Sequence, residues 1–442
     1  MEKGLRYYIE TYGCQMNAHD SERLAGILTS VGFEPAASEE EADLILFNTC
    51  CVRENAELKI FGNVGALKKK KREKPELIIG VCGCMMQQEE VAERLAKTFP
   101  FVNIVFGTHN MVTLPGMLYK AIFEKKRTLA VSDQEDVPGS IEARREAPPL
   151  FSVNIMQGCD NFCSYCIVPY VRGRERSRAS EDIVKEVTEQ VKKGYKEVML
   201  LGQNVNSYGK GLPEETDFAG LLEKIATTTG VERIRFMTSH PKDVSDRLLA
   251  VMAKYDNICK QLHLPVQSGS TRVLKEMNRK YTREDYLALI ERVRRALPGV
   301  FLSTDIIVGF PGETREEFEE TLSLVKEVGF DAAYTFVYSI RSGTRAARME
   351  DQIPEEEKQR RIVQLVALQG QLTYESNLRN EGKIERVLIE GTSKRDEGHI
   401  CGRTDGGKMV NLAGEESLVG QFVQVEITKA KKTTLYGRRI EE

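Results

Sequence analysis

Three cysteines lie within eight positions in the stretch GCDNFCSYC at residues 158–166. Cys159, Cys163 and Cys166, here called the central trio, have the spacing CxxxCxxC, with no fourth cysteine or histidine nearby in the sequence. Thiolates are the natural ligands of zinc and of iron–sulfur clusters. A structural zinc site closes its tetrahedron with four protein ligands, whereas three thiolates around a 4Fe–4S cube leave one iron open for a substrate. The spacing therefore favours the cube over a zinc site or buried thiols.

A second set of cysteines follows apolar runs near the N-terminus. Cys14 follows YYIETYG, Cys50 and Cys51 follow ADLILFNT, and Cys82 and Cys84 lie in ELIIGVCGC. Because the carboxyl ends of strands in an open α/β sheet are where ligands bind, we expect these cysteines to converge and each doublet to supply one ligand. The pattern predicts a second cluster with an open iron. The residues alone do not choose within each doublet, and the alternative is a set of buried reduced cysteines.

The elements that must position these cysteines follow from hydrophobic periodicity. Alternating strand-like and helix-like stretches over residues 5–120 predict an open α/β domain, and a charged stretch without periodicity at 121–148 predicts a linker. Six apolar runs alternating with amphipathic helices over residues 149–375 predict a partial (β/α)6 barrel with a lateral opening. Short strands and turns over residues 376–440 predict a small β-barrel. The expected fold class is therefore α/β.

Composition excludes several classes of protein. The chain has 442 residues, of which 41% are hydrophobic and 29% charged, as in soluble globular proteins. No apolar run reaches membrane-spanning length and MEKGLRYYIE has no apolar signal region, so we expect a cytoplasmic protein without membrane contact. The net charge of −3 means that any RNA contact comes from local patches. Ten cysteines in a cytosolic chain predict metal ligands or reduced thiols rather than disulfides.

The central trio, with Tyr165 just before its last cysteine and after the first predicted barrel strand, resembles the radical S-adenosylmethionine (SAM) superfamily. The resemblance implies that the open iron binds SAM and that an electron from the cluster cleaves it to a 5′-deoxyadenosyl radical. Over essentially the whole chain the motifs are similar to those of the methylthiotransferase family. They are YGCQMN..DSE, NTC.VRE.AE.K, GC..Q, GCDNFCSYCIVPYVRGRERSR, LPVQSGS and TDIIVGFPGET.

This resemblance implies a role for each set of cysteines. The central trio would hold the catalytic 4Fe–4S cluster that binds and cleaves SAM. An auxiliary 4Fe–4S cluster would be held by Cys14, Cys50 and Cys84, here called the N-terminal trio. Cys51 and Cys82 stand where the family usually has other residues, which leaves open whether either replaces its neighbour as a ligand.

Further cofactor contacts are expected where the strands of the barrel end. Superfamily members bind SAM across the tops of the strands, and each candidate also has a purely structural reading as turn chemistry or packing. The residues expected to contact SAM are Tyr165, Gln203, Asn204, Ser239, Gln267, Ser268 and Val337.

Two basic stretches predict contacts with RNA. RGRERSR directly follows the central trio, and arginine binds phosphate and stacks on bases. KAKKTTLYGRR, in a segment that resembles the RNA-binding TRAM domain, combines a basic track with a tyrosine. The alternatives are a solvated loop and a solubilising edge strand. The residues expected to contact RNA are Arg172, Arg174, Arg176, Lys431, Lys432, Tyr436 and Arg438.

The resemblance implies a tRNA methylthiotransferase that converts N6-isopentenyladenosine at tRNA position 37 to its 2-methylthio derivative. Carbon 2 of adenine carries no acidic hydrogen, so radical chemistry is required. The expected partners are the tRNA anticodon stem-loop, an electron donor such as flavodoxin or ferredoxin, and the iron–sulfur assembly machinery. Relatives that act on threonylcarbamoyladenosine or a ribosomal protein share the same layout. An alternative of another class is a non-catalytic iron–sulfur redox sensor or electron carrier that binds RNA.

Overall fold

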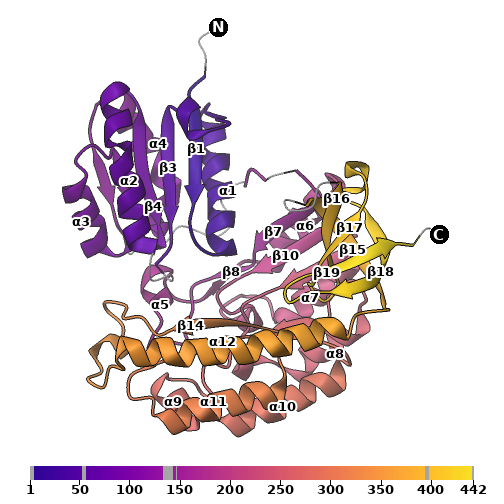
Figure 1. Cartoon of the computed structure of the whole chain (residues 1–442). Helices are drawn as coiled ribbons and strands as arrows, with labels where there is room; N and C mark the ends of the chain where they lie inside the picture. Colours follow the sequence, from indigo (N-terminus) through magenta and orange to yellow (C-terminus); the bar gives the residue numbers. More distant parts are fainter. Residues whose placement is uncertain (1–3, 52–55, 133–142, 146, 394–397, 441–442) are drawn as a thin grey trace. The chain divides into compact units, whose positions relative to one another are not determined.

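The computed structural model describes residues 4–51, 56–132, 143–145, 147–393 and 398–440 (Figure 1). The chain divides into two compact units. Unit 1 comprises Met1–Glu146, Met156–Asp160 and Ile167–Arg178, and unit 2 comprises Ala147–Ile155, Asn161–Cys166 and Ala179–Glu442. Cys159 of the central trio therefore belongs to unit 1, whereas Cys163 and Cys166 belong to unit 2.

Within the described residues, unit 1 is built on a six-stranded parallel sheet of order β2-β1-β3-β4-β5-β6. Its strands are β1 (Arg6–Thr11), β2 (Glu34–Pro35), β3 (Leu44–Thr49), β4 (Ile78–Gly83), β5 (Ile104–Phe106) and β6 (Thr128–Ala130). Its helices are α1 (Gln15–Ser30), α2 (Ala56–Glu73), α3 (Glu89–Thr98), α4 (Leu114–Ile122) and α5 (Val168–Val171). A short antiparallel pair, β8 (Met156–Gln157) and β9 (Arg176–Ser177), completes the unit. This confirms the predicted open α/β domain.

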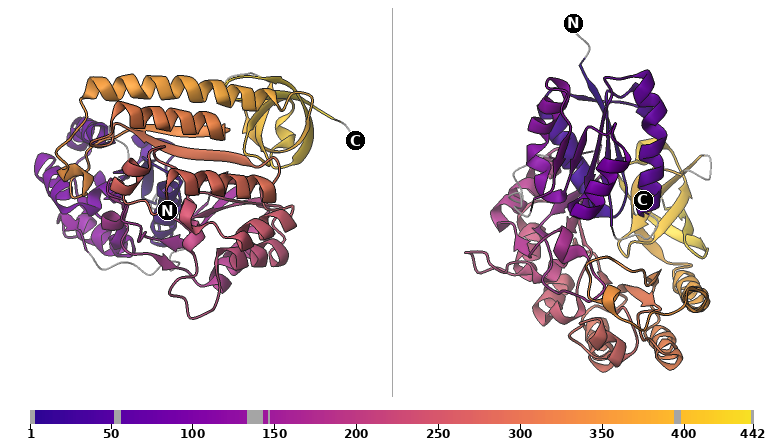
Figure 2. Two further views of the ribbon diagram at one scale, coloured as in Figure 1. Left: turned by 90° about the horizontal axis from the view of Figure 1, so that it is seen from below. Right: turned by 90° about the vertical axis from the view of Figure 1, so that its left-hand side faces the viewer.

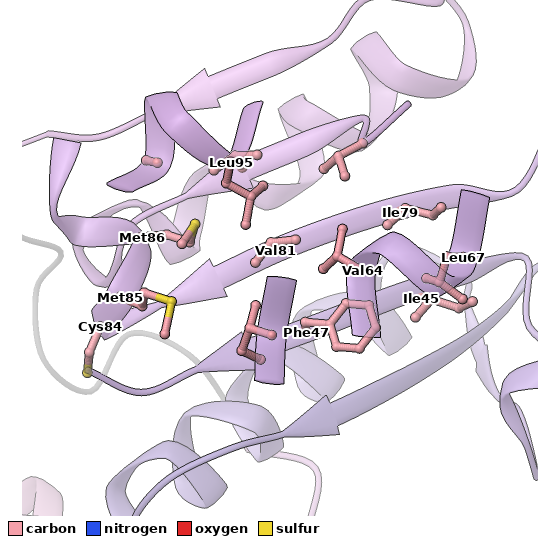
Figure 3. Close-up of a cluster of buried hydrophobic side chains, with 14 of the residues drawn as sticks. Ile45, Phe47, Val64, Leu67, Ile79, Val81, Cys84, Met85, Met86 and Leu95 are labelled. Atoms are coloured by element: carbon pink, nitrogen blue, oxygen red, sulfur yellow. The ribbon is translucent and has the colours of Figure 1, made fainter. Parts of the chain in front are cut away.

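Side chains of the central strands alternate between the two faces of this sheet. Ile45 and Phe47 of β3 pack with residues of α2 and α3, in the buried cluster shown in Figure 3. Leu44 and Leu46 pack on the opposite face with α1 and α4. A parallel sheet covered on both faces needs strands that are apolar at successive positions, which explains the run LILF.

One strand lies in the segment that the sequence predicted to be a linker. β6 pairs in parallel with β5, with Leu129 opposite Val105. Three residues are too few to show the alternation typical of a strand. The charged residues just before them favour the prediction of a linker instead. Residues 133–142 and 146 of the predicted linker lie outside the described residues.

Unit 2 contains the partial barrel, in which six described strands form two parallel sheets, β11-β10-β7 and β12-β13-β14. A parallel bridge between Ile234 and Ile258 links β11 to the residues just before β12. The strands are β7 (Leu150–Asn154), β10 (Glu197–Leu201), β11 (Arg233–Phe236), β12 (Gln261–His263), β13 (Phe301–Val308) and β14 (Ala332–Val337). The helices are α6 (Ser180–Lys192), α7 (Phe218–Thr228), α8 (Asp246–Lys254), α9 (Thr271–Glu276), α10 (Arg283–Ala296) and α11 (Arg315–Val328). The predicted (β/α)6 architecture is confirmed.

A long helix, α12 (Glu355–Leu378), leads into the C-terminal β-barrel. Figure 2 shows it beside α11, with which it is in contact, and its end reaches the C-terminal barrel. The described strands close in the order β15-β16-β17-β19-β18, which confirms the predicted small barrel. They are β15 (Ile384–Thr392), β16 (His399–Thr404), β17 (Met409–Ala413), β18 (Phe422–Ala430) and β19 (Leu435–Arg439).

Buried charges hold this C-terminal barrel against β10 and β11. Glu197 Oε2 lies 3.2 Å from Arg233 Nη1, and Glu197 Oε1 lies 2.8 Å from Arg235 Nε. Arg233 also donates to the carbonyl oxygens of Arg386 and Arg403, and Arg235 donates to carbonyl oxygens at the end of β16. Breaking a buried pair by removing one partner is costly because it leaves an uncompensated charge. The network therefore ties the two parts of unit 2 together.

Replacing Glu197 with alanine removes the buried carboxylate that Arg233 and Arg235 share, and leaves Arg233 only its partly exposed pair with Asp405. We expect Glu197→Ala to lower the free energy of unfolding of the full chain by about 3–5 kcal/mol, measured by urea denaturation. Glu232→Ala is the matched control, because Glu232 forms half-exposed pairs with Lys196 and Arg386 and its loss costs at most about 1 kcal/mol. Equal losses in the two variants would contradict this account.

Candidate functional site

The N-terminal trio lies at the carboxyl edge of the sheet in unit 1. Its members follow the adjacent parallel strands β1, β3 and β4, in which Thr11 pairs with Asn48 and Thr49 pairs with Gly83. Gly13 has a φ of +124°, and a Cβ there would lie 3.0 Å from the sulfur of Cys50. The YGC motif therefore needs its glycine so that the loop of Cys14 can approach Cys50.

One buried side chain, Asn17 at the start of α1, contacts two of these thiols. Its Oδ1 lies 3.7 Å from Cys14 Sγ and 3.8 Å from Cys84 Sγ. Its Nδ2 donates to the carbonyl oxygens of Tyr12 and Thr49, which fixes the amide with its oxygen toward the sulfurs. Cysteines from two strand ends therefore meet at one amide oxygen, as the sequence predicted for this edge.

The structure separates Cys82 from Cys84. Cys82 lies inside β4 with its side chain in the core formed with α1 and α4, and burial raises the pKa of its thiol well above the usual value. Cys84 follows the strand and belongs to the opposite cluster (Figure 3). Hydrogen bonding from Cys51, and then the charge of Arg172, lower the pKa of Cys84 to about 7 despite its burial. Cys84 of this doublet therefore lies with Cys14 at Asn17, whereas Cys82 lies in the core on the opposite face.

Both members of the other doublet lie near the sulfurs of the edge. Cys50 contacts Gly13, whereas Cys51 is hydrogen-bonded to Cys84, and this contact, together with burial, raises the pKa of Cys51. Among the described residues, no group of three or more His, Cys, Asp or Glu side chains surrounds the position of a single metal ion. A cube places its cysteines on different irons, so three thiols that hold one stand apart rather than around one point.

Arg172, which the sequence predicted to contact RNA, is buried instead and is only 4% exposed. Its Nε donates to Cys84 Sγ at 3.2 Å, and its Nη2 donates to Asp20 Oδ2 at 2.6 Å and to Asn17 Oδ1 at 3.2 Å. A guanidinium held by a buried carboxylate is not available to a phosphate. The prediction for Arg172 was therefore wrong. The residues that bury and pair it lie far away in the sequence, so its neighbours in the sequence did not reveal them.

The loop of the central trio is held in place by main-chain contacts in each unit. In unit 1, the amide of Cys159 donates to the carbonyl oxygen of Gly173 at 3.2 Å. In unit 2, the amide of Cys166 donates to the carbonyl oxygen of Cys163 at 2.9 Å. Ser164 between them is buried, and its amide and hydroxyl donate to the carbonyl oxygens of Met277 and Glu276. These contacts hold each part of the loop within its own unit.

A buried arginine that was not predicted from the sequence, Arg279, contacts the central trio. Its Nη1 lies 3.5 Å from Cys163 Sγ, its Nη2 donates to the carbonyl oxygen of Pro265 at 2.6 Å, and its Nε donates to Tyr281 Oη at 2.8 Å. Burial, and then the nearby charge of Arg279, lower the pKa of His240 to about 2, so His240 is neutral and is not an acid–base group near pH 7.

Two of the residues expected to contact SAM present unpaired polar atoms at the ends of β10 and β11. Asn204 donates from Nδ2 to Asp243, but its buried Oδ1 has no hydrogen-bond partner among the described residues, and neither has the buried hydroxyl of Ser239. The amide of Val205 donates to the carbonyl oxygen of Thr238, which holds the two loops together. Asn206, not predicted, has two further buried atoms without a partner in the described chain. These orphaned groups fit a polar ligand.

The other expected SAM contacts have structural roles as well. Ser268 is fully buried, and its hydroxyl lies 3.4 Å from that of Thr321 and accepts from the amide of Ser270, so this hydroxyl already has partners within the protein. Gln267 has a φ of +73° and pairs through its backbone with β13. Tyr165 packs on a core cluster of unit 2. Gln203 and Val337 are half-buried at the ends of β10 and β14.

The remaining residues expected to contact RNA are accessible to different degrees. Lys431 and Lys432 are exposed between β18 and β19, and the Lys431 ammonium lies 4.2 Å from the ring centre of Tyr436. Arg438 is exposed and pairs with Glu426 at 2.7 Å. In unit 1, the exposed Arg174 pairs with Asp160 at 2.8 Å, and Arg176 is half-buried in β9.

Comparison with known families gives three matches in the order of the domains. The Uncharacterized protein family UPF0004 matches residues 6–107, the Radical SAM superfamily matches residues 153–325, and the TRAM domain matches residues 378–440. Among solved structures, the radical SAM methyltransferase TsrM from Kitasatospora setae has a TM-score of 0.58 at 15% identity and covers 78% of this chain and 77% of its own. Fold and matches together define the class as a radical SAM enzyme.

Two curated relatives identify the family within this class. The tRNA-2-methylthio-N(6)-dimethylallyladenosine synthase of Clostridium perfringens (strain SM101 / Type A) is 53% identical over 442 residues, which cover 100% of this chain and 99% of the relative. The synthase of the same name from Caldicellulosiruptor saccharolyticus is 54% identical and covers 99% of this chain and 93% of its own. The chain belongs to the family of tRNA-2-methylthio-N(6)-dimethylallyladenosine synthases.

Alanine variants within each doublet test the ligand set of the N-terminal trio. Two 4Fe–4S clusters bring about eight iron atoms per chain. We expect Cys84→Ala and Cys50→Ala to lower the iron content after anaerobic reconstitution to about four, because one cluster is lost. Cys82→Ala and Cys51→Ala are the matched controls and should keep about eight. Iron loss in either control, with retention in its neighbour, would reassign that ligand.

Proposed function

We propose that this chain attaches a methylthio group to carbon 2 of N6-isopentenyladenosine at position 37 of tRNA. The observation that carries this proposal is identity of 53% over the full length to curated synthases named for that product, in a chain that has both trios of cysteines. The group called dimethylallyl in the relatives' name is the isopentenyl group of the proposed substrate.

The chain offers a separate set of residues for each required cofactor. The central trio would hold the 4Fe–4S cluster that binds SAM, and the N-terminal trio would hold the auxiliary 4Fe–4S cluster. When bound, these groups supply the electron, the radical and the sulfur that acid–base side chains lack. The thiol chemistry fits iron, because cysteine thiolates are the common ligands of such clusters.

The protein's own residues would orient these groups. Asn17 and Gly13 fix the spacing of the N-terminal trio, and Ser164 fixes the loop of the central trio. The orphaned polar atoms of Asn204 and Ser239 would accept from or donate to the polar parts of SAM. His240 is buried and neutral, so it would not compete as a base near pH 7.

The C-terminal barrel is the proposed tRNA-binding part of the chain. Its match to the TRAM domain and the family of its relatives support tRNA as the partner. The exposed Lys431 and Lys432 would contact backbone phosphates, and Tyr436 would stack on a base. The target base must leave the stack of the anticodon loop, which costs a few kcal/mol and least in a single-stranded loop. Arg174, Arg176 and Arg438 remain further proposed contacts.

The remaining proposals concern partners and location. A flavodoxin or ferredoxin would supply the electron, and the iron–sulfur assembly machinery would load the clusters. None of the described helices combines the length and apolar character that crossing a bilayer requires. The family, whose named product is a tRNA nucleoside, supports a cytoplasmic location.

Analysis of tRNA nucleosides tests the proposed product directly. In cells that lack the gene, mass spectrometry should show N6-isopentenyladenosine in place of its 2-methylthio derivative, and expression of the intact chain should restore the derivative. Cys159→Ala should fail to restore it, because a trio without one thiolate cannot hold the SAM-binding cluster. Loss of 2-methylthio-threonylcarbamoyladenosine instead would establish the sibling substrate, and unchanged nucleosides would favour a ribosomal-protein substrate or a non-catalytic sensor.

Removing the two exposed lysines between β18 and β19 tests the RNA contact. We expect Lys431→Ala/Lys432→Ala to weaken binding of an anticodon stem-loop and to reduce the steepness of log affinity against log salt by about 1.4 to 1.8, because two phosphate contacts are lost. The matched control is Lys68→Ala/Lys69→Ala, an exposed pair on α2. A slope that is unchanged, or that changes equally in the control, would exclude this contact.

A further inference from the structure

In each trio, one thiol is in contact with a different buried arginine. Arg172 Nε lies 3.2 Å from Cys84 Sγ in unit 1, and Arg279 Nη1 lies 3.5 Å from Cys163 Sγ in unit 2. A hydrogen bond from a charged donor takes negative charge away from a thiolate. Hydrogen bonds to the sulfurs are one of the factors that set the reduction potential of an iron–sulfur cluster.

The position of Arg172 is fixed from both ends of the side chain. Its amide donates to the carbonyl oxygen of Val168, and Val171, just before it, is buried in the core and accepts from Thr108 Oγ1 at 2.6 Å. At the other end, the guanidinium is held by Asp20 and by the oriented amide of Asn17. The Nε therefore points at Cys84 without freedom to turn away.

Asp20 limits the positive charge that Arg172 brings to the thiolate of Cys84. Asp20 is 3% exposed and its Oδ2 lies 2.6 Å from Arg172 Nη2, so its charge offsets much of the charge of Arg172. Its Oδ1 also lies 3.9 Å from Nη1 of the buried Arg23. The effect of Arg172 on the thiolate is then the directed hydrogen bond from Nε together with the part of its charge that Asp20 does not offset. A lone arginine would instead add a full positive charge beside the cluster.

We propose that Arg172 is a positioning residue that donates to the Cys84 thiolate and raises the reduction potential of the auxiliary cluster, with Asp20 limiting the rise. This inference rests on the proposed assignment of Cys84 as a ligand. Arg172 follows Cys166 of the central trio by six residues in the sequence. The segment that starts at the SAM-binding cysteines therefore also supplies a hydrogen bond to the auxiliary site.

The test uses the full chain with Cys159, Cys163 and Cys166 replaced by alanine, so that only the auxiliary cluster forms. The midpoint potential of this parent is measured by anaerobic redox titration followed by electron paramagnetic resonance. Arg172→Met/Asp20→Asn removes the hydrogen bond and the buried pair together. We expect the potential to fall so that the reduced-to-oxidised ratio at fixed ambient potential drops about tenfold, which is about 59 mV for one electron.

Asp20→Asn alone should move the potential in the opposite direction, because it leaves the arginine charge uncompensated beside the cluster. Arg172→Lys keeps the charge and should stay closer to the parent than Arg172→Met/Asp20→Asn does. Arg94→Met, which removes an exposed arginine of unit 1, is the matched control and should leave the potential unchanged.

The possible results separate the cluster assignment from the role of Arg172. A parent that binds no iron and sulfide would overturn the cluster assignment itself. A parent that holds about four irons, with the same potential in Arg172→Met/Asp20→Asn, would overturn the role of Arg172 alone. If the double variant cannot be loaded with iron, Asp20→Asn decides, because an unchanged or lower potential in that variant contradicts the proposal.

Discussion

The site in unit 1 depends on the register of three adjacent parallel strands. Because β1, β3 and β4 end side by side, residues more than thirty positions apart in the sequence come to one edge of the sheet. Both faces of the sheet are buried, so the strands cannot slip without exposing apolar side chains. The loops that carry the thiols are short extensions of these fixed strands, and Asn17 joins them through buried hydrogen bonds.

The central trio is positioned by different means. Its cysteines lie within eight residues of one loop. In unit 2, Ser164 donates to a neighbouring carbonyl oxygen, and Asn278 donates to the carbonyl oxygens of Asn161 and Phe162. The N-terminal trio needs a folded sheet before its thiols meet. Assembly of the auxiliary site is therefore linked more closely to folding of its domain than assembly of the SAM-binding site, and it is more sensitive to packing around β3 and β4.

The sequence predicted the three-part fold and the family because those features are local. Periodicity identifies the strands, and the cysteine motifs are contiguous. Features that depend on distant partners were missed or assigned wrongly. Arg172 lies in a charged stretch that is typical of solvated loops, but it is buried because Asp20, 152 positions away, neutralises it. Ser268 was expected at a strand end but lies five residues beyond β12, and its hydroxyl packs against Thr321 of α11. Asn206 was missed because an asparagine in a polar loop is common and does not by itself indicate a ligand contact.

The central claim is that the central trio leaves one iron of its cluster open to SAM. The most direct measurement is electron paramagnetic resonance of the reduced, anaerobically reconstituted chain in which the N-terminal trio is replaced by alanine, recorded before and after addition of SAM. Coordination of the open iron predicts a changed spectrum with SAM and no change with 5′-methylthioadenosine, which lacks the amino and carboxylate groups that would chelate the iron. A spectrum that SAM leaves unchanged would contradict the account.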